Sequence, residues 1–120
     1  MANKEKTFAS AIIYVHNAEN RIERFLKTII EIMEENFQNS EIICVNDSSD
    51  DNSLMCIKKT SKLASMTSVS VVNMSYFHGL ELSMNAGIDI SIGDFVFEFD
   101  NTYLDFEPGV IMEIYSRCLK

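Results

Sequence analysis

Four short apolar segments, separated by stretches with helical periodicity, constrain the fold of this chain more than any other feature. The segments lie at residues 8–15, 42–45, 68–73 and 95–99 and contain few charged side chains. Such segments are typical of strands that are buried on both faces of a parallel sheet. Strands that alternate with helices predict an α/β fold, in which a mostly parallel sheet carries helices on both faces.

The stretches between these segments predict the helices. The clearest helix begins at Ala18, with Asn17 as its cap. Its apolar residues recur at three- and four-residue spacing and are Ile22, Phe25, Leu26, Ile29, Ile30 and Met33. A second helix is predicted over residues 51–64. The candidate caps for this helix are Asp50, Asp51 and Ser53. The residues expected to face the sheet are Leu54, Ile57 and either Leu63 or Ala64.

A third predicted helix follows Gly79, and a fourth begins at Pro108, where the missing N–H of proline does no harm. One apolar stripe of the third helix consists of Leu80, Met84, Gly87, Ile88 and Ile92. A glycine inside a helix costs about 1 kcal/mol relative to alanine, so we expect Gly87 to pack closely against a strand.

Length and composition exclude several classes of protein. With 120 residues, 47% hydrophobic and 23% charged, the chain is long enough for one globular domain and too short for two. A net charge of -8 argues against a surface that binds nucleic acid or anionic lipid non-specifically. The chain has no run of about 18 apolar residues, so no membrane span is predicted. Cys44, Cys56 and Cys118 lack metal-type spacing, and we interpret them as reduced thiols of a cytoplasmic protein.

Polar residues gather where the predicted strands end. His16 and Asn17 follow the first strand, Asp47 follows the second, and Asp100 follows the fourth. In an open parallel sheet, ligands bind at the carboxyl ends of the strands. We therefore interpret Asp47 and Asp100 as ligand-binding residues, with solvated loop carboxylates as the alternative.

Four motifs in a fixed order refine this interpretation. They are IIYVHNAE at residues 12–19, EIICVNDSSDDNS at 41–53, GLELSMNAGI at 79–88 and GDFVFEFD at 93–100. In order and spacing they resemble the motifs of the amino-terminal half of family 2 glycosyltransferases. The resemblance covers most of the chain and implies the GT-A fold, a three-layer Rossmann-like α/β domain. It also implies that residues 1–120 form the donor-binding half, and that an acceptor half with the catalytic base would follow.

The resemblance implies that the donor is a nucleotide sugar, commonly a uridine diphosphate sugar. The implied nucleotide-binding residues are Tyr14, His16, Asn17, Asp47, Asn85 and Asp100. Asp47 would hydrogen-bond the uracil ring, along which Tyr14 and His16 would lie. Asp100 is the first residue of the family's Asp-x-Asp motif, which contacts the ribose and a diphosphate bound to Mg or Mn. The hydroxyl of a saccharide or lipid-linked acceptor would attack the anomeric carbon, in polysaccharide or glycoconjugate synthesis.

The chain departs from the family's motifs at three charged positions. Thr102 stands where the Asp-x-Asp motif has its second Asp, Asn46 where a pair of Asp residues has its first, and Met84 where the family has Arg. The candidate metal ligands are Asp100, Thr102, Asp105 and Glu107. These departures leave two hypotheses. The chain is either a glycosyltransferase donor domain or a non-catalytic glycosyltransferase-like domain that serves in binding or assembly.

Two other α/β classes fit the sequence poorly. A receiver domain needs paired acids after the first strand, where this chain has His16 and Asn17. A flavodoxin-like domain needs a phosphate loop rich in Gly and hydroxyl groups at the same place. The sequence also predicts no nucleic-acid partner and a cytoplasmic location. The protein would lie peripheral to the membrane only through a portion outside this chain or through a partner.

Overall fold

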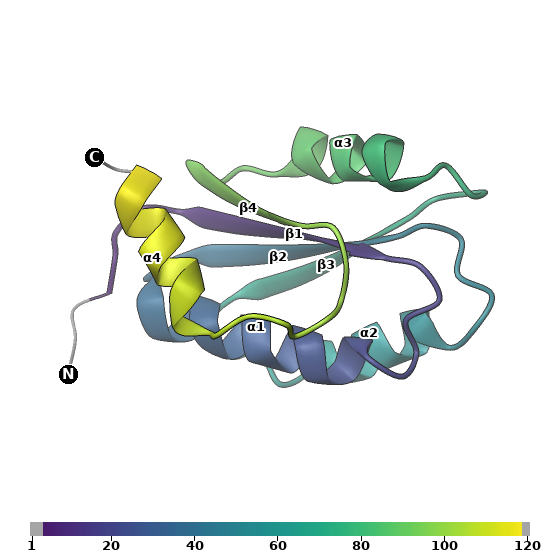
Figure 1. Ribbon diagram of the computed structural model, residues 1–120, viewed down its shortest axis with the longest axis horizontal. Helices are drawn as coiled ribbons and strands as arrows, with labels where there is room; N and C mark the ends of the chain where they lie inside the picture. Colours follow the sequence, from purple (N-terminus) through teal and green to yellow (C-terminus); the bar gives the residue numbers. More distant parts are fainter. Residues whose placement is uncertain (1–3, 119–120) are drawn as a thin grey trace.

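The computed structural model describes residues 4–118 and confirms the predicted alternation of strands and helices (Figure 1). Its elements, in chain order, are β1 (Ala9–Val15), α1 (Ile22–Asn36), β2 (Ser40–Asn46), α2 (Ser53–Ser61), β3 (Ser68–Asn73), α3 (Leu80–Ile90), β4 (Phe95–Phe99) and α4 (Gly109–Cys118). The last helix begins at Gly109, one residue after its predicted start at Pro108. No helix among residues 4–118 is both long and apolar enough to cross a membrane.

The sheet has four parallel strands in the order β3-β2-β1-β4. In register, Val15 at the end of β1 lies beside Asn46 at the end of β2, and Ile13 lies beside Phe99 of β4. Because all four strands run in the same direction, their carboxyl ends meet at one edge of the sheet. This edge is on the right in Figure 1.

Helices cover both faces of the sheet, which confirms the predicted three-layer α/β architecture. In Figure 1, α3 lies above the sheet and α1 and α2 lie below it. The core on the α1 side is the larger, and its biggest buried side chains include Phe25, Leu26, Ile29, Phe37 and Tyr115. Tyr115 brings α4 onto the same side, where its ring lies 5.1 Å from that of Phe37. The core on the α3 side consists of Ile12, Ile43, Val45 and Met84.

Gly87 packs closely against the sheet, as its place inside a helix predicts. A Cβ atom at this position would lie 2.6 Å from Cγ2 of Ile12 and 2.8 Å from Cγ2 of Val45. Real Cβ atoms do not approach other heavy atoms so closely. The missing side chain therefore lets α3 sit directly on β1 and β2.

The start of α1 differs from the prediction. The helix begins at Ile22 rather than at Ala18, and Asn17 is not its cap. Residues 18–21 form a turn instead, in which the N–H of Arg21 donates to the carbonyl oxygen of Ala18 at 2.9 Å. Asn17 adopts a φ of 48°, and its side chain accepts a hydrogen bond from the N–H of Asp50 at 2.7 Å. The asparagine is thus occupied by a neighbouring loop, which the local pattern does not reveal.

The second helix is shorter than predicted, and only part of its expected inner side is buried. Ile57 is buried in α2, and of the two alternatives beyond the helix Ala64 packs against the core, whereas Leu63 is 57% exposed. The cap residue is Asn52, and no side chain caps the helix there. The predicted cap Asp51 lies one position before Asn52, and its Oδ1 accepts a hydrogen bond from the N–H of Ser53, the first residue of the helix, at 3.0 Å.

The stripe predicted for α3 is only partly correct. Met84 and Gly87 face the sheet together with Ser83, which the apolar pattern did not include. Leu80, the first helical residue, and Ile92, which follows the end of the helix, are exposed. Helical spacing no longer applies to Ile92, so its place in the stripe was wrong.

The three cysteines are free, as predicted. Cys44 is buried in β2, Cys56 is half-buried, and Cys118 is exposed. Burial raises the pKa of the Cys44 thiol to about 12, which keeps it protonated and unreactive.

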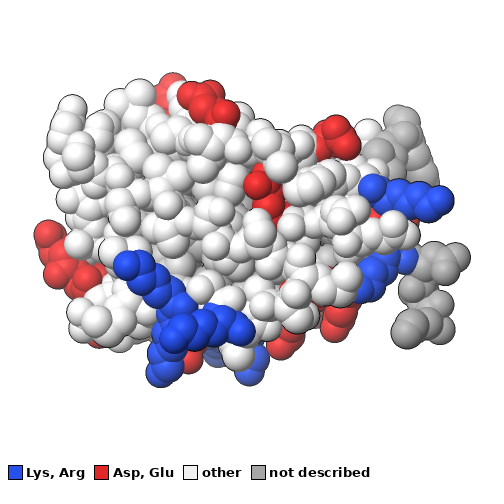
Figure 2. All heavy atoms as spheres, turned by 180° about the vertical axis from the view of Figure 1, so that it is seen from behind, with Lys and Arg blue, Asp and Glu red and all other residues white. Residues whose placement is uncertain are grey.

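The charged side chains do not form a basic surface on the side of the molecule seen in Figure 2. Uncharged residues make up most of that face, basic side chains lie at the lower left and at the right edge, and acidic side chains are scattered over the face. This distribution agrees with the net charge of -8.

Candidate functional site

Asp47 is the most highly connected polar residue at the carboxyl edge of the sheet. It follows β2 directly and is 0% exposed. Its Oδ2 accepts hydrogen bonds from the hydroxyl of Tyr14 at 2.7 Å and from the N–H of Gly79 at 2.9 Å. Its Oδ1 accepts a hydrogen bond from the N–H of His78 at 2.8 Å. The carboxylate therefore joins β1 and β2 to the loop that precedes α3.

These contacts determine the charge of the site. Burial by itself would raise the pKa of the Asp47 carboxyl, but the hydrogen bonds from His78, Tyr14 and Gly79 outweigh burial and lower the pKa below its ordinary value. Burial, together with the hydrogen bond to Asp47 and the charge of Asp47, raises the pKa of the Tyr14 hydroxyl far above its usual range. At neutral pH the pair is a charged carboxylate and a neutral phenol.

The loop that Asp47 holds places aromatic rings beside the first turn of the chain. The carbonyl oxygen of Asp47 accepts a hydrogen bond from Nδ1 of His16 at 2.7 Å. The His16 ring packs edge-on against Phe77, with ring centroids 4.9 Å apart. Tyr76 and Phe77 are 67% and 59% exposed. Sequence reasoning missed both aromatic residues, although two consecutive aromatic residues just before Gly79 were a signal that could have identified them.

Asn17 and Asn46 link the loops at this edge to one another. Oδ1 of Asn46 accepts a hydrogen bond from Ser49 at 2.6 Å, and its Nδ2 donates to Asn73 at 3.1 Å. The N–H of Asn17 donates to Oγ of Ser49 at 3.0 Å. Asn46, which stands where the family has an Asp, therefore accepts a hydrogen bond from the loop after β2 and donates one to β3. An aspartate could not donate the second of these bonds.

Asn85 and Asp100 are exposed, in contrast to Asp47. Asn85 lies on α3, outside the set of residues that the helix buries. Asp100 directly follows β4, and its Oδ1 accepts a long hydrogen bond, 3.4 Å, from Nδ2 of Asn101. Both side chains are free to meet a ligand, but the structure does not link them to Asp47 by hydrogen bonds.

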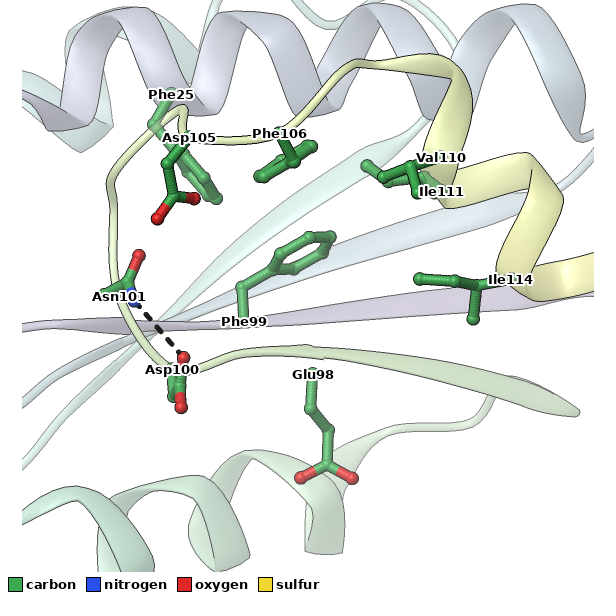
Figure 3. Close-up of a pocket in the computed structure, with 10 residues that line it drawn as sticks. All are labelled: Phe25, Glu98, Phe99, Asp100, Asn101, Asp105, Phe106, Val110, Ile111 and Ile114. Carbon is green, nitrogen blue, oxygen red and sulfur yellow. Dashed lines mark hydrogen bonds between the residues drawn. The ribbon is translucent and has the colours of Figure 1, made fainter.

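A cavity of about 270 Å³ lies next to Asp100, between β4 and the loop that leads to α4 (Figure 3). Its apolar part includes Phe25, Phe99 and Phe106, and its polar part includes Asp100, Asn101 and Asp105. Figure 3 shows Asp105 on the opposite side of the opening from Asp100 and Asn101. The structure therefore brings the predicted residues Asp100 and Asp105 to one cavity.

Thr102 does not share that cavity. It is 4% exposed, and its Oγ1 accepts a hydrogen bond from Nε of Arg21 at 3.2 Å. The guanidinium of Arg21 also lies over the ring of Tyr103, 4.5 Å from its centroid. Thr102 is thus directed toward the start of α1 and lines a second cavity of about 250 Å³.

Among the predicted metal ligands, Thr102 lies apart from Asp100 and Asp105. Thr102 is turned toward an arginine, which repels a cation. Among residues 4–118, no three His, Cys, Asp or Glu side chains are grouped so that they could hold a metal ion. A hard divalent cation requires several oxygen ligands, and the predicted ligands Asp100 and Asp105 line one cavity together with Glu98 and Asn101.

Comparison with known proteins agrees with the predicted family and fold. The sequence model of Glycosyl transferase family 2 matches residues 10–101. The uncharacterized glycosyltransferase sll0501 of Synechocystis sp. is 31% identical over 108 residues, which are 90% of this chain. The uncharacterized glycosyltransferase YkcC of Bacillus subtilis is 26% identical, also over 90% of this chain. The chain spans about a third of the length of these relatives, 33% and 32%.

A solved structure shares the fold. The mannosyltransferase PcManGT from Pyrobaculum calidifontis, in complex with GDP-Man and Mn2+, superposes with a TM-score of 0.69. The two sequences are 16% identical, and the match covers 77% of this chain and 26% of that chain. At this identity the likeness shows the fold alone, and it confirms the predicted GT-A type. Since the family match extends over more than half of its residues, the chain belongs to glycosyl transferase family 2.

Proposed function

We propose that this chain is the donor-binding half of a glycosyltransferase and that it binds a nucleotide diphosphate sugar at the carboxyl edge of β1, β2 and β4. The transferred sugar would pass to an acceptor hydroxyl, which attacks the anomeric carbon as the diphosphate leaves. The chain spans about a third of the length of its curated relatives, so transfer is proposed for a protein that joins these residues to an acceptor-binding part.

The observation that carries this proposal is the Asp47 cluster, which consists of Asp47 and its donors Tyr14, His78 and Gly79. The chain that contains this cluster belongs to glycosyl transferase family 2. Asp47 holds the loop of residues 76–79 against β1, which leaves Phe77 exposed beside His16 and Tyr76 exposed where it stacks on His78. Exposed aromatic faces stack well on nucleobases, and each stacked base contributes about 1–3 kcal/mol. We propose that the base lies on this surface and that Asp100 contacts the ribose.

The role of Asp47 in base recognition stays a prediction, because its carboxylate is buried and already accepts three hydrogen bonds from the protein. A direct contact with uracil requires the loop around His78 to open. Without that movement, Asp47 would act by fixing the loop rather than by touching the base.

The experiment is a thermal unfolding assay with millimolar nucleotide. A ligand that binds only the folded state raises the melting temperature. We expect uridine diphosphate to do so. Guanosine diphosphate is tested beside it because the structural neighbour was solved with GDP-Man. A shift with guanosine diphosphate alone would replace uridine as the proposed base. No shift with either, for a folded sample, would contradict the donor proposal.

Matched variants test at which edge of the sheet the nucleotide binds. Asp100→Ala removes an exposed carboxylate at the carboxyl end of β4 and should abolish most of the shift. Asp94→Ala removes an exposed carboxylate just before the same strand, at the opposite edge of the sheet, and should leave the shift unchanged. Equal effects of the two variants would argue for binding away from the carboxyl edge.

A second candidate function is a non-catalytic domain that serves in binding or assembly. The burial of Thr102 against Arg21 favours it, because this threonine stands at the family's metal-binding position. In that case neither nucleotide should raise the melting temperature. A saccharide or lipid-linked acceptor and a cytoplasmic location remain parts of the proposal for the whole protein, and a divalent ion is one of two candidate partners for the diphosphate.

A further inference from the structure

The second cavity at the carboxyl edge differs in charge from the rest of this acidic chain. It measures about 250 Å³ and is lined by Asn20, Arg21, Arg24, Thr102, Tyr103 and Leu104. Two of these residues are arginines and none is acidic, although the chain carries a net charge of -8. Among the residues that the structure describes, neither guanidinium lies within ion-pair distance of a carboxylate. Two uncompensated cations around one cavity indicate an anionic ligand.

Arg21 is held in position for such a ligand. Its Nε donates to Thr102 at 3.2 Å, and its planar group lies over the ring of Tyr103. These contacts use one face and one nitrogen of the guanidinium. Its two terminal nitrogens have no acceptor among residues 4–118. A fixed guanidinium with free terminal nitrogens matches the geometry of phosphate oxygens.

The identity of residue 102 follows from this arrangement. An aspartate there, as in the family's motif, would form an ion pair with Arg21 and cancel its charge. Threonine accepts the same hydrogen bond without neutralising the guanidinium. The replacement at position 102 therefore preserves the positive charge of Arg21.

We propose that the cavity of Arg21 and Arg24 binds the diphosphate of the nucleotide donor, and that the two guanidinium groups neutralise it in place of a divalent metal ion. This inference rests on the proposed donor function. It explains why the described residues contain no cluster of metal ligands although the chain belongs to the family. The ligand class is a diphosphate ester, bound by charge and bidentate hydrogen bonds.

The test is calorimetric titration of inorganic pyrophosphate, uridine diphosphate and guanosine diphosphate into the folded chain. Each titration is done once in EDTA and once with Mn2+. We expect binding in EDTA that Mn2+ does not strengthen. Uridine monophosphate serves as the comparison that lacks the second phosphate, and it should bind more weakly than the diphosphate.

Variants locate the binding. Arg21→Gln and Arg24→Gln should each weaken the binding of pyrophosphate about tenfold, because each variant loses one charge-assisted hydrogen bond. Arg24 is exposed, so this variant should fold even if the buried contacts of Arg21 prove necessary. The matched control is Lys27→Gln, which removes an exposed cation of the same helix outside the cavity and should leave binding unchanged.

Thr102→Asp separates the two mechanisms. With arginines as the diphosphate site, the new carboxylate pairs with Arg21 and weakens binding in EDTA. With a metal as the diphosphate site, the same change creates Mn2+-dependent binding and leaves binding in EDTA unaffected, which would overturn the inference.

The inference and the donor function can fail separately. Two results would overturn the inference and leave the donor function standing. Either the nucleotides bind only with Mn2+, or both arginine variants leave nucleotide binding intact. A different result would support the anion site and contradict the donor function. In that case pyrophosphate binds in EDTA, both arginine variants weaken its binding, and neither nucleotide binds.

Discussion

Asp47 illustrates how one residue can belong to a functional site and to the stability of the fold. Its three hydrogen-bond donors come from Tyr14 in β1 and from His78 and Gly79, which precede α3. A buried carboxylate that accepts several hydrogen bonds stabilises the folded state, because its removal leaves donors unpaired. The sequence placed Asp47 at the rim of the sheet, but its burial depends on donors 31 and 32 residues away.

We predict that Asp47→Asn lowers the free energy of unfolding by about 3 kcal/mol, because the neutral amide presents N–H groups to N–H donors. Tyr14→Phe removes a single hydrogen bond and should cost about 1 kcal/mol. Urea unfolding measures both. The matched control is Asp50→Asn at an exposed position nearby, where we expect a change below about 0.5 kcal/mol. Equal values for the two Asp→Asn variants would show that the Asp47 cluster does not stabilise the fold.

At the scale of elements, α3 depends on the contact that Gly87 permits with β1 and β2. The helix buries few residues, namely Ser83, Met84 and Gly87. A close approach of its backbone to the sheet compensates for this small buried face, since Ile12 and Val45 fill the space that a side chain at position 87 would need. The glycine could be recognised in the sequence because it interrupts an otherwise helical pattern, whereas the exposed ends of α3 could not.

We predict that Gly87→Ala destabilises the protein by about 1–3 kcal/mol, because overpacking outweighs the higher helix propensity of alanine. The control is Gly109→Ala at the first residue of α4, where a Cβ atom would meet nothing within 4 Å. This control should change the free energy of unfolding by less than about 0.5 kcal/mol. Thermal or urea unfolding compares the two variants. A neutral or stabilising Gly87→Ala would contradict the close packing of α3.

At the scale of the whole molecule, buried and half-buried carboxylates connect distant segments and make stability depend on pH. Glu34 in α1 accepts hydrogen bonds from the N–H groups of Ser65, Met66 and Thr67 before β3. Burial raises the pKa of Glu34, but these hydrogen bonds outweigh burial and lower it overall. The pKa values of Asp47 and Asp51 are lowered in the same way.

The sign of the pH dependence follows from these directions. A carboxyl whose pKa is lower in the folded state adds stability that is complete above its unfolded pKa of about 4, and this stability is lost as the pH falls through the folded pKa. We predict a constant free energy of unfolding between about pH 5 and pH 7 and a steady decrease below about pH 4. Urea unfolding at several pH values measures it. Stability that increases toward pH 3 would contradict the assignment.

A pair of adjacent variants separates Glu34 from general charge effects. Glu34→Gln should reduce stability at pH 7 by about 2 kcal/mol and make the acid decrease shallower, because one linked carboxylate is gone. Glu35→Gln removes the exposed neighbour on the same helix and should retain the wild-type pH profile. If both variants behaved alike, the loop before β3 would not be held by Glu34.

The sequence alone determined the order of strands and helices, the parallel α/β architecture and the family, because apolar periodicity and motif spacing are local properties of the chain. Tertiary structure decided which polar groups remain available to a ligand. Asp47, predicted to contact the base, is occupied by donors from a distant loop, and Thr102 meets Arg21 across a separation of 81 residues. Hydrogen bonds of this kind join segments that only the folded sheet brings together, so no local pattern encodes them.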